Sequence, residues 1–286
     1  MTTKARDALD FDPERRAVPP KDAATLMVLR DGKAGPEIFC VRRHAQSPFV
    51  GGAVVFPGGK LDPADRDRGL PTTAPSPLAT RFATDPEEAR ALAVCACRES
   101  LEEAAILPAT PTPDAAAVEA HQTTLNAKER SFSELLVAEG LELTLDALHP
   151  FGRWVTPEAE QRRFDARFFI ARLPAGQRGR HDARETTSSV WARPERVLES
   201  FIAGELLLVP PTLRCLELLT GCADVDAALT LAREQSLLPI CPKFVPDDPP
   251  RLVLPGDPDH DLPDPRIAGP TRFVLRDERF ISEAAP

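Results

Sequence analysis

The sequence predicts an α+β fold in which helices pack against a mixed β-sheet. The chain has 286 residues, 42% of them hydrophobic, which is enough to bury a large core. Short apolar runs and capped helical segments are mixed without the regular alternation of a parallel βαβ protein. Composition changes near residue 239, where prolines become frequent. We therefore expect a flexible N-terminal segment at 1–20, one domain at 21–238, and a proline-rich extension at 239–286 that packs on it.

The first strands are predicted by apolar runs that end at turn residues. Asp31-Gly32 marks a turn between two of them, and Pro57-Gly58-Gly59 stops the third. The predicted strands are Ala23–Leu29, Glu37–Arg42 and Ala53–Phe56.

A helix is predicted after a loop at Leu70–Pro77. Asp85 is a good N-cap and Pro86 suits the first helical position. We expect the helix to continue to about Leu107, because Pro108 cannot extend it.

The remaining chain contains both helical and strand patterns. Helical patterns are seen at Asp114–Leu148, Pro194–Ala203 and Pro211–Cys222. Strands are expected around Val155 and at Arg167–Ala171, Ser189–Ala192, Arg251–Leu254 and Arg272–Leu275.

Charge and cysteine content exclude several classes of function. The net charge is −9, so we expect no nucleic-acid partner, because such binding needs a basic face. We expect neither a leader peptide nor a bilayer-spanning segment, and no membrane partner. The six cysteines have no zinc-site spacing. Reduced thiols in a cytoplasmic protein are the simplest interpretation.

Acidic residues cluster on the helix predicted at 85–107, in the segment Arg98-Glu99-Ser100-Leu101-Glu102-Glu103. At about 100° per residue, the three glutamates and Arg98 fan across one face beside an apolar face. Such a face is usually only solvated. The alternative is a divalent cation, because Mg²⁺ prefers hard oxygen ligands.

A glycine turn upstream favours the cation. Val54–Lys60 predicts a strand that runs into Gly58-Gly59, where the backbone can approach a ligand closely. Each feature alone is weak, but the strand, the glycine turn and the acidic helix form a rarer combination.

These residues resemble the signature of the Nudix hydrolases. Gly59 matches its opening glycine, Asp65 stands where the family has Glu, and Ile106 matches its last aliphatic position. The catalytic core of the signature is matched by Arg98-Glu99 and Glu102-Glu103. The resemblance implies the Nudix fold, a mixed sheet sandwiched between helices.

The sequence departs from the Nudix signature in three ways, and one of them indicates a particular branch of the family. Gly59 and Arg98 are 39 positions apart, about 25 more than in the signature, which implies an insertion at Leu61–Asp85 inside the Nudix box. Ser100 replaces an aliphatic residue, and Ala105 replaces a glycine. The insertion is similar to that of the acyl-CoA diphosphatase branch, as are the segments Arg42-Arg43-His44, Phe49–Gly59, Phe151–Pro157, Arg163–Phe169 and Leu208–Leu213.

The resemblance implies metal-dependent hydrolysis of the diphosphate bond in a nucleoside diphosphate-linked compound, with Mg²⁺ or Mn²⁺ as cofactor. The expected metal ligands are Glu99, Glu102, Glu103, the Gly58 carbonyl and, from a distant loop, Glu185, with Glu160 as the second candidate for that place. Arg98 would orient a carboxylate, and Glu99 is either a ligand or the general base.

Substrate contacts are expected from basic residues. Arg42 and Arg43 could bind phosphates, and Arg153 belongs to a second basic cluster that could bind the nucleotide. Solvated charges, or pairing with acidic residues, explain these arginines equally well. CoA or acyl-CoA is the expected small-molecule substrate, and the alternatives are ADP-ribose, a dinucleotide or a nucleotide sugar. A non-catalytic nucleotide-binding module on the same scaffold, and a homodimer, also remain open.

Overall fold

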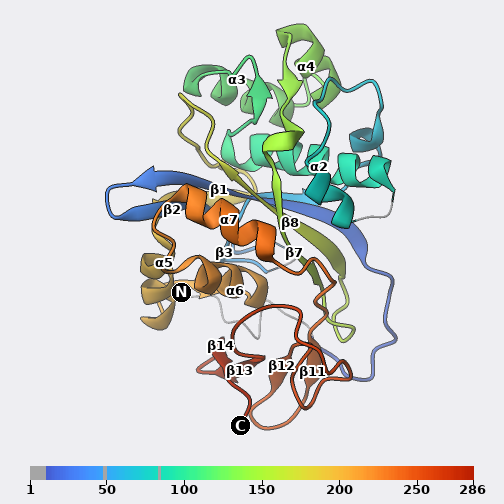
Figure 1. Cartoon of the computed structure of the whole chain (residues 1–286), viewed down its shortest axis with the longest axis vertical. Helices are drawn as coiled ribbons and strands as arrows, with labels where there is room; N and C mark the ends of the chain where they lie inside the picture. The colour runs from blue at the N-terminus through green and yellow to red at the C-terminus, as the bar shows by residue number, and fades with distance from the viewer. Residues whose placement is uncertain (1–10, 48–49, 83–84) are drawn as a thin grey trace.

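The main β-sheet lies between two groups of helices, with a second sheet at the C-terminal end (Figure 1). This computed structural model describes residues 11–47, 50–82 and 85–286. Helices α2 (Pro86–Ala104), α3 (Ala115–Asn126) and α4 (Phe132–Glu139) lie on one side, and α5 (Pro194–Ile202), α6 (Pro210–Leu219) and α7 (Val225–Glu234) lie on the other. Both faces of the sheet are therefore covered, as the predicted layered α+β fold requires.

The main sheet has the strand order β10-β3-β2-β1-β8-β7, with β4 paired to β1 and β9 paired to β2. Strands β1 and β8 are parallel, whereas β1 pairs antiparallel with both β2 and β4. The strand bounds are β1 Lys21–Gly32, β2 Gly35–Arg43, β3 Ala53–Val55, β4 Gly58–Lys60, β7 His149–Val155, β8 Phe164–Arg172, β9 Thr186–Ala192 and β10 Leu207–Leu208.

Alternation along β1 divides the hydrophobic core into two parts. Leu26 and Val28 point toward α2, whereas Met27 and Leu29 belong to the core under α6 and α7. Successive side chains of a strand face opposite sides of the sheet, so a strand covered on both sides is apolar throughout. This explains why the run Ala23–Leu29 shows no polar alternation.

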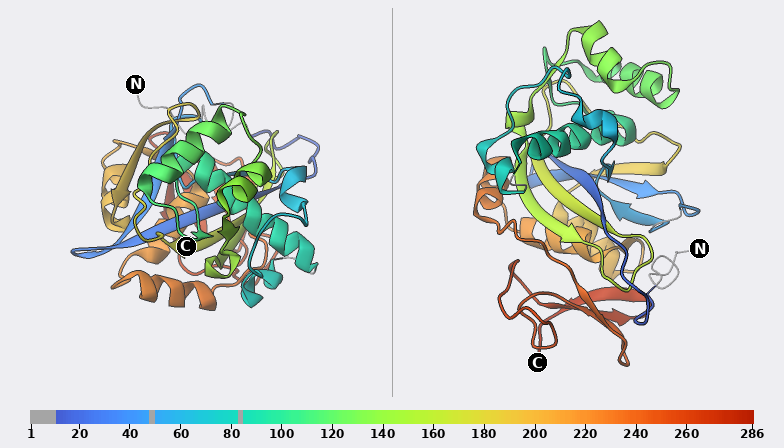
Figure 2. Two further views of the ribbon diagram at one scale, coloured as in Figure 1. Left: turned by 90° about the horizontal axis from the view of Figure 1, so that it is seen from above. Right: turned by 90° about the vertical axis from the view of Figure 1, so that its right-hand side faces the viewer.

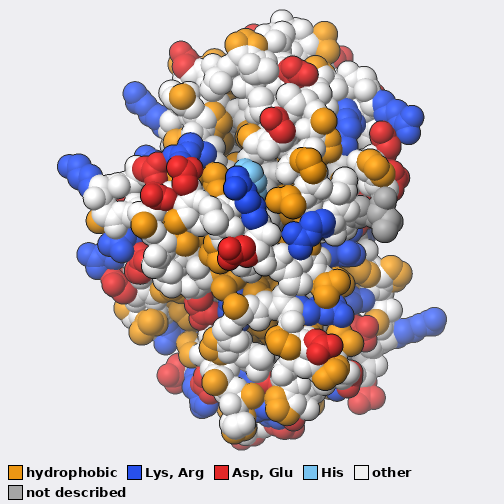
Figure 3. Space-filling view, in the orientation of Figure 1, with side chains coloured by type: hydrophobic (Ala, Val, Ile, Leu, Met, Phe, Trp, Pro, Cys, Tyr) orange, Lys and Arg blue, Asp and Glu red, His pale blue; other side chains and the backbone are white. Residues whose placement is uncertain are grey.

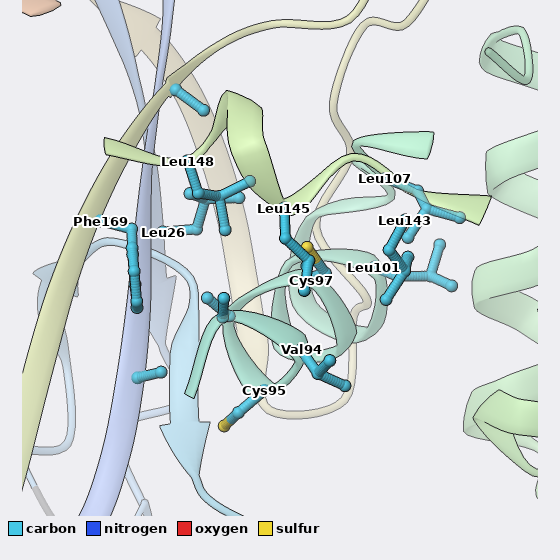
Figure 4. Close-up of a cluster of buried hydrophobic side chains, with 14 of the residues drawn as sticks. Leu26, Val94, Cys95, Cys97, Leu101, Leu107, Leu143, Leu145, Leu148 and Phe169 are labelled. Carbon is cyan, nitrogen blue, oxygen red and sulfur yellow. The ribbon is translucent and has the colours of Figure 1, made fainter. Parts of the chain in front are cut away.

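Helix α2 packs against the sheet through the apolar face that its helical periodicity predicts. Val94, Cys97 and Leu101 are fully buried and lie near Leu26 and Phe169 (Figure 4). The Asp85 carboxylate caps the first turn by accepting the Glu87 N–H at 3.0 Å. Packing of this face fixes the orientation of the opposite, acidic face.

The predicted end of this helix is wrong by three residues. The helix stops at Ala104, because Ala105 adopts the left-handed conformation at φ 49° and ψ 47°. The Ile106 N–H then bonds to the Ser100 carbonyl, which satisfies a helix-end acceptor. Ala105 occupies the place where the resemblance predicts glycine, so the turn is kept although the residue differs.

The segments between these elements contain short helical turns and strands. In the expected insertion lie the 3₁₀ turns η1 (Pro63–Arg66) and η2 (Pro77–Arg81), while residues 83–84 are outside the described residues. The region predicted as mostly helical at 114–148 contains α3 and α4, followed by non-helical chain. The remaining short elements are β5 Ala109–Thr110, β6 Glu142–Leu143 and η3 Leu145–Ala147.

The proline-rich extension forms a four-stranded antiparallel sheet of its own, in the order β11-β12-β13-β14. Its strands are β11 Lys243–Val245, β12 Arg251–Val253, β13 Arg272–Arg276 and β14 Arg279–Glu283. Sequence patterns predicted only β12 and β13. Phe11 of the N-terminal segment stacks on Phe244 of β11 at 4.7 Å between ring centroids, so this part of the segment is packed on the protein.

Arg214 of α6 holds the extension to the domain. Its fully buried guanidinium donates to the carbonyls of Ala268 and Pro270 at 2.8 and 2.6 Å, and to Glu217 at 2.7 Å. Figure 2 shows the extension beneath the helices that carry this side chain. Within the described residues, no helix combines the length and apolar composition needed to cross a bilayer.

Replacement of Arg214 by methionine is expected to lower the free energy of unfolding by about 3–5 kcal/mol, because buried acceptors lose their donor. Urea denaturation measures this change. Arg196→Met is the control. It removes an exposed ion pair with Glu199 within α5 and should lower the free energy of unfolding by less than about 1 kcal/mol. Equal effects of the two substitutions would contradict the anchoring role of Arg214.

Candidate functional site

Strand β4 meets the acidic face of α2 at Gly58. The Gly58 N–H donates to a carboxylate oxygen of Glu103 at 3.1 Å. The hydrogen bonds to β1 are made by residues on either side of Gly58. The Leu26 N–H donates to the Pro57 carbonyl, and the Leu61 N–H donates to the Asp22 carbonyl. Because the N–H and C=O of one strand residue point to the same side, the Gly58 carbonyl also faces Glu103 rather than β1.

Both glycines are required by the close approach of their neighbours. A Cβ at Gly59 would lie 2.6 Å from the carboxylate of Glu99, and one at Gly58 would lie 2.6 Å from the Ala24 carbonyl. At Gly58 the close atoms include backbone, which cannot move aside, whereas at Gly59 the Glu99 carboxylate would have to shift. Absence of side chains therefore lets α2 bring its carboxylates against the backbone of β4.

Arg98 organises the carboxylates on its own helix and one from the insertion. Its Nε and Nη2 donate to the two oxygens of Asp65 at 2.8 and 2.9 Å. Its Nη1 donates to Glu99 at 2.8 Å and to Glu102 at 3.2 Å. Asp65 is buried and also caps η1 through the Asp62 N–H. The expected forked bond is thus present, with Asp65 as its acceptor.

Burial perturbs the acidic groups of this cluster. Desolvation raises the pKa of Glu99 to about 7 and that of Glu103 to about 8. Desolvation also raises the pKa of Glu102, while Arg98 opposes the shift. Each group is further disfavoured as an anion by a neighbouring carboxylate. The anionic forms of these carboxylates are therefore disfavoured, and an additional cation would stabilise them.

The donor atoms suit a hard divalent cation, although the described residues hold no preformed cluster of three acidic, His or Cys side chains around one point. Three carboxylates and a backbone carbonyl are oxygen ligands of the kind that Mg²⁺ and Mn²⁺ prefer. Here the Arg98 Nη1 donates to both Glu99 and Glu102, so the guanidinium holds these two carboxylates. The donor atoms therefore fit such a cation, and the side chains of Glu99 and Glu102 would have to turn away from Arg98 to bind it.

A cavity of about 500 Å³ opens beside the cluster. Glu99, Glu102, Glu103 and Gly58 line it, as does Arg43 of β2. The Arg43 guanidinium lies 3.6 Å from Glu103 and 3.9 Å from a second acidic residue, Glu185. This volume is typical of small-molecule sites. Glu103 is buried, and Glu99 and Glu102 are partly buried beside this cavity, so these three carboxylates do not form a purely solvated face.

Other predicted residues are only partly brought together. Glu185 lines the cavity with a side chain that is 68% exposed, and Glu160 lines it while nearly fully buried. Arg42 and Arg153 are not among the residues that line this cavity, because Arg42 donates to the Glu205 carbonyl at 3.1 Å and Arg153 is ion-paired with a strand carboxylate at 2.6 Å. Their expected contact with substrate stays a prediction.

Two parts of the site were missed by sequence reasoning. Asp65 was noted only as the match to a signature glutamate, and its position in the signature was the signal for its pairing with Arg98. An apolar wall on the far side of the cavity includes Trp154, Phe164 and Phe168. From the sequence, Trp154 and Phe164 were expected either to stack on the nucleotide beside the second basic cluster or to lie in the core. Phe168 was missed, because core and cavity aromatics have the same strand alternation. On the outer face shown in Figure 3, acidic and basic side chains are interspersed.

Comparison with known proteins places this arrangement in a family. A family model described as the NUDT19 Nudix domain matches residues 77–219, half of the chain. Acyl-coenzyme A diphosphatase NUDT19 of Homo sapiens is 30% identical over 219 residues, which cover 62% of this chain and 58% of the human protein. The protein of the same name from Gallus gallus is 28% identical, over 63% of this chain and 60% of its own length. The chain thus spans somewhat under two thirds of these relatives.

A solved structure shows the same fold. The crystal structure of a NUDIX hydrolase from Alicyclobacillus acidocaldarius matches with a TM-score of 0.63 and 31% identity, over 74% of this chain and 96% of that one. This confirms the expected Nudix fold.

Alanine at Gly59 is expected to displace Glu99, because the new Cβ would overlap its carboxylate. We expect binding of Mn²⁺ to weaken by about tenfold or more, measured by isothermal titration calorimetry, since changes that misplace a metal ligand have effects of this size. Gly152→Ala is the control, because the nearest atom to its added Cβ is 3.7 Å away. Unchanged Mn²⁺ affinity in Gly59→Ala would argue against this close approach.

The raised pKa values predict that the metal-free protein becomes less stable as pH rises from about 5 to about 8. Glu99 and Glu103 bind protons more tightly when folded than in the unfolded chain, where their pKa is about 4.3. The folded state therefore gains stability at low pH and loses it as the pH passes through these raised values. Urea denaturation across this range measures the slope.

In Glu103→Gln the fall should be shallower, because one of the two titrating groups is gone. A slope identical to that of the unaltered protein would contradict the assignment of Glu103.

Proposed function

This chain belongs to the Nudix hydrolases, in the branch of the NUDT19 Nudix domain, and on that basis we propose that it hydrolyses the diphosphate bond of CoA or acyl-CoA with the help of a divalent cation. The observation that carries the proposal is the convergence of Glu99, Glu102, Glu103 and Gly58 on one cavity. Intact carboxylates favour an enzyme over a non-catalytic module on the same scaffold.

Glu99, Glu102, Glu103 and the Gly58 carbonyl are the groups that would hold Mg²⁺ or Mn²⁺. When bound, such a cation neutralises phosphate oxygens and makes a coordinated water more acidic. Glu185 would complete the set from the β9 side, since it lines the same cavity. Their common position at one cavity supports this assignment.

The roles of the protein groups follow from their contacts. Arg98 is a positioning residue, since it bonds to Asp65, Glu99 and Glu102. Cleavage requires that water attack one phosphorus and lose a proton to a base. Glu99 and Glu103 are the candidates, because their raised pKa values of about 7 and about 8 are close to neutrality.

Arg43 is the residue that we assign to the diphosphate. It is the arginine that lies between Glu103 and Glu185 in the cavity. A cation bound by these carboxylates would release the guanidinium, which can then bind phosphate oxygens bidentately. This assignment replaces Arg42 and Arg153 in the substrate-binding role.

CoA is proposed as the substrate because the relatives that match the chain are named acyl-coenzyme A diphosphatases. A panel of CoA, acyl-CoA, ADP-ribose, a dinucleotide and a nucleotide sugar tests it, with Mg²⁺ or Mn²⁺ and a coupled phosphate assay. We expect kcat/KM to be greatest for CoA or its esters. A greater value for ADP-ribose would overturn the substrate, and no turnover of any compound would overturn the activity.

Glu103→Gln is expected to reduce kcat by about 10²-fold or more, because removal of a catalytic or metal-binding carboxylate has effects of this size. Circular dichroism should show that the fold persists. Glu87→Gln, near the start of the same helix and outside the cavity lining, is the matched control. Activity of Glu103→Gln equal to that of Glu87→Gln would refute the role of Glu103.

A further inference from the structure

The cavity beside the acidic cluster continues to the C-terminal sheet. Phe11 from the N-terminal segment and Pro242 and Leu252 from the extension line the same cavity as the glutamates of α2. Figure 1 places α2 and the C-terminal sheet on opposite sides of the main sheet. One continuous space therefore joins an acidic part, made by α2 and β4, to an apolar part made by the two ends of the chain.

Phe11 is fixed at this apolar part by aromatic contacts. Its ring stacks on Phe244 with an interplanar angle of 12°, and meets Phe280 edge-on at 6.0 Å between centroids. Its backbone forms a bridge with Glu160. In Figure 2 the blue N-terminal segment reaches the red C-terminal sheet, in agreement with these contacts. Two distant parts of the sequence thus make one wall.

The chemistry of this wall favours an alkyl group over a nucleotide base. Three prolines line the cavity, Pro210, Pro211 and Pro242, and proline has no backbone N–H to donate. A purine needs donors and acceptors for its ring and exocyclic nitrogens, whereas an alkyl chain needs only apolar surface. Glu160 and Arg162 also line this cavity, and both already interact within the protein.

We propose that Phe11 and Leu252 form the end of an acyl subsite and set the length of the fatty acyl chain that the enzyme accepts. This inference rests on the proposed function, because the diphosphate must lie at the carboxylates for the thioester end to extend toward the C-terminal sheet. The extension and the N-terminal segment then act in substrate selection as well as in packing.

The test compares kcat/KM for CoA esters of increasing acyl length, each divided by the value for free CoA. Phe11→Ala lengthens the subsite and should raise this ratio for long chains by about tenfold, since two further buried methylenes contribute about that factor. Leu252→Phe fills the subsite and should lower the ratio for long chains. Opposite shifts in the two variants cannot arise from loss of stability alone.

Phe132→Ala is the matched control, because Phe132 is a buried phenylalanine of α4 that does not line the cavity. It should leave the ratio within about twofold, as expected for a distant site. Chain-length profiles of Phe11→Ala and Leu252→Phe that both match the unaltered protein would overturn the subsite while leaving CoA hydrolysis intact.

If the unaltered protein hydrolyses neither CoA nor its esters, the proposed function fails and binding of dodecanoate decides the subsite. Titration calorimetry should then show binding to the unaltered protein and at least about tenfold weaker binding to Leu252→Phe. Absence of dodecanoate binding, or equal binding by both proteins, would overturn the subsite.

Discussion

Close contact between the carboxylates of α2 and the backbone of β4 is the constraint on which the site depends. Glu103 accepts the Gly58 N–H, and Glu99 lies where a side chain at Gly59 would be. Burying several carboxylates together is unfavourable, because each loses hydration and repels the others. Arg98 and Arg43 compensate part of this cost. The pKa values of Glu99 and Glu103 remain raised, because the compensation is incomplete.

The rest of the fold maintains this contact. The apolar face of α2 packs on β1 and β8, which fixes the rotation of the helix, while pairing of β4 with β1 fixes the glycines. The segment at 61–85, which we interpret as an insertion, contributes Asp65, whose carboxylate accepts a hydrogen bond from Arg98. Substitution of Asp for Glu at this position shortens the side chain, and the 3₁₀ turn η1 brings it within hydrogen-bond distance. The insertion is thus joined to the site through Arg98.

The elements near the site were well predicted where local patterns decide them. Helix period placed the acidic and apolar faces of α2, and Asp85 with Pro86 placed its start. The end of α2 was predicted too late in the sequence. Alanine does not favour the left-handed conformation by itself, so the conformation of Ala105 depends on the tertiary structure around it. Strands β11 and β14 were not predicted, since frequent prolines and polar residues obscure the pairing that makes them. Helix α7 was not predicted either, although its segment contains no proline and Asp224 caps its first turn.

The amino-acid sequence by itself predicted the acidic face of α2 and the glycine turn before it, because a helix of fixed period and a pair of glycines need no distant partner to be recognised. The roles of these residues in the chemistry stay predictions. Tertiary structure alone decided which arginine faces the cavity. Arg42, Arg43 and Arg153 are chemically equivalent in the sequence, but ion pairing and strand position direct only Arg43 to the carboxylates. The apolar part of the cavity likewise required folding, because Phe11 and Leu252 line the same cavity only when the two ends of the chain pack together.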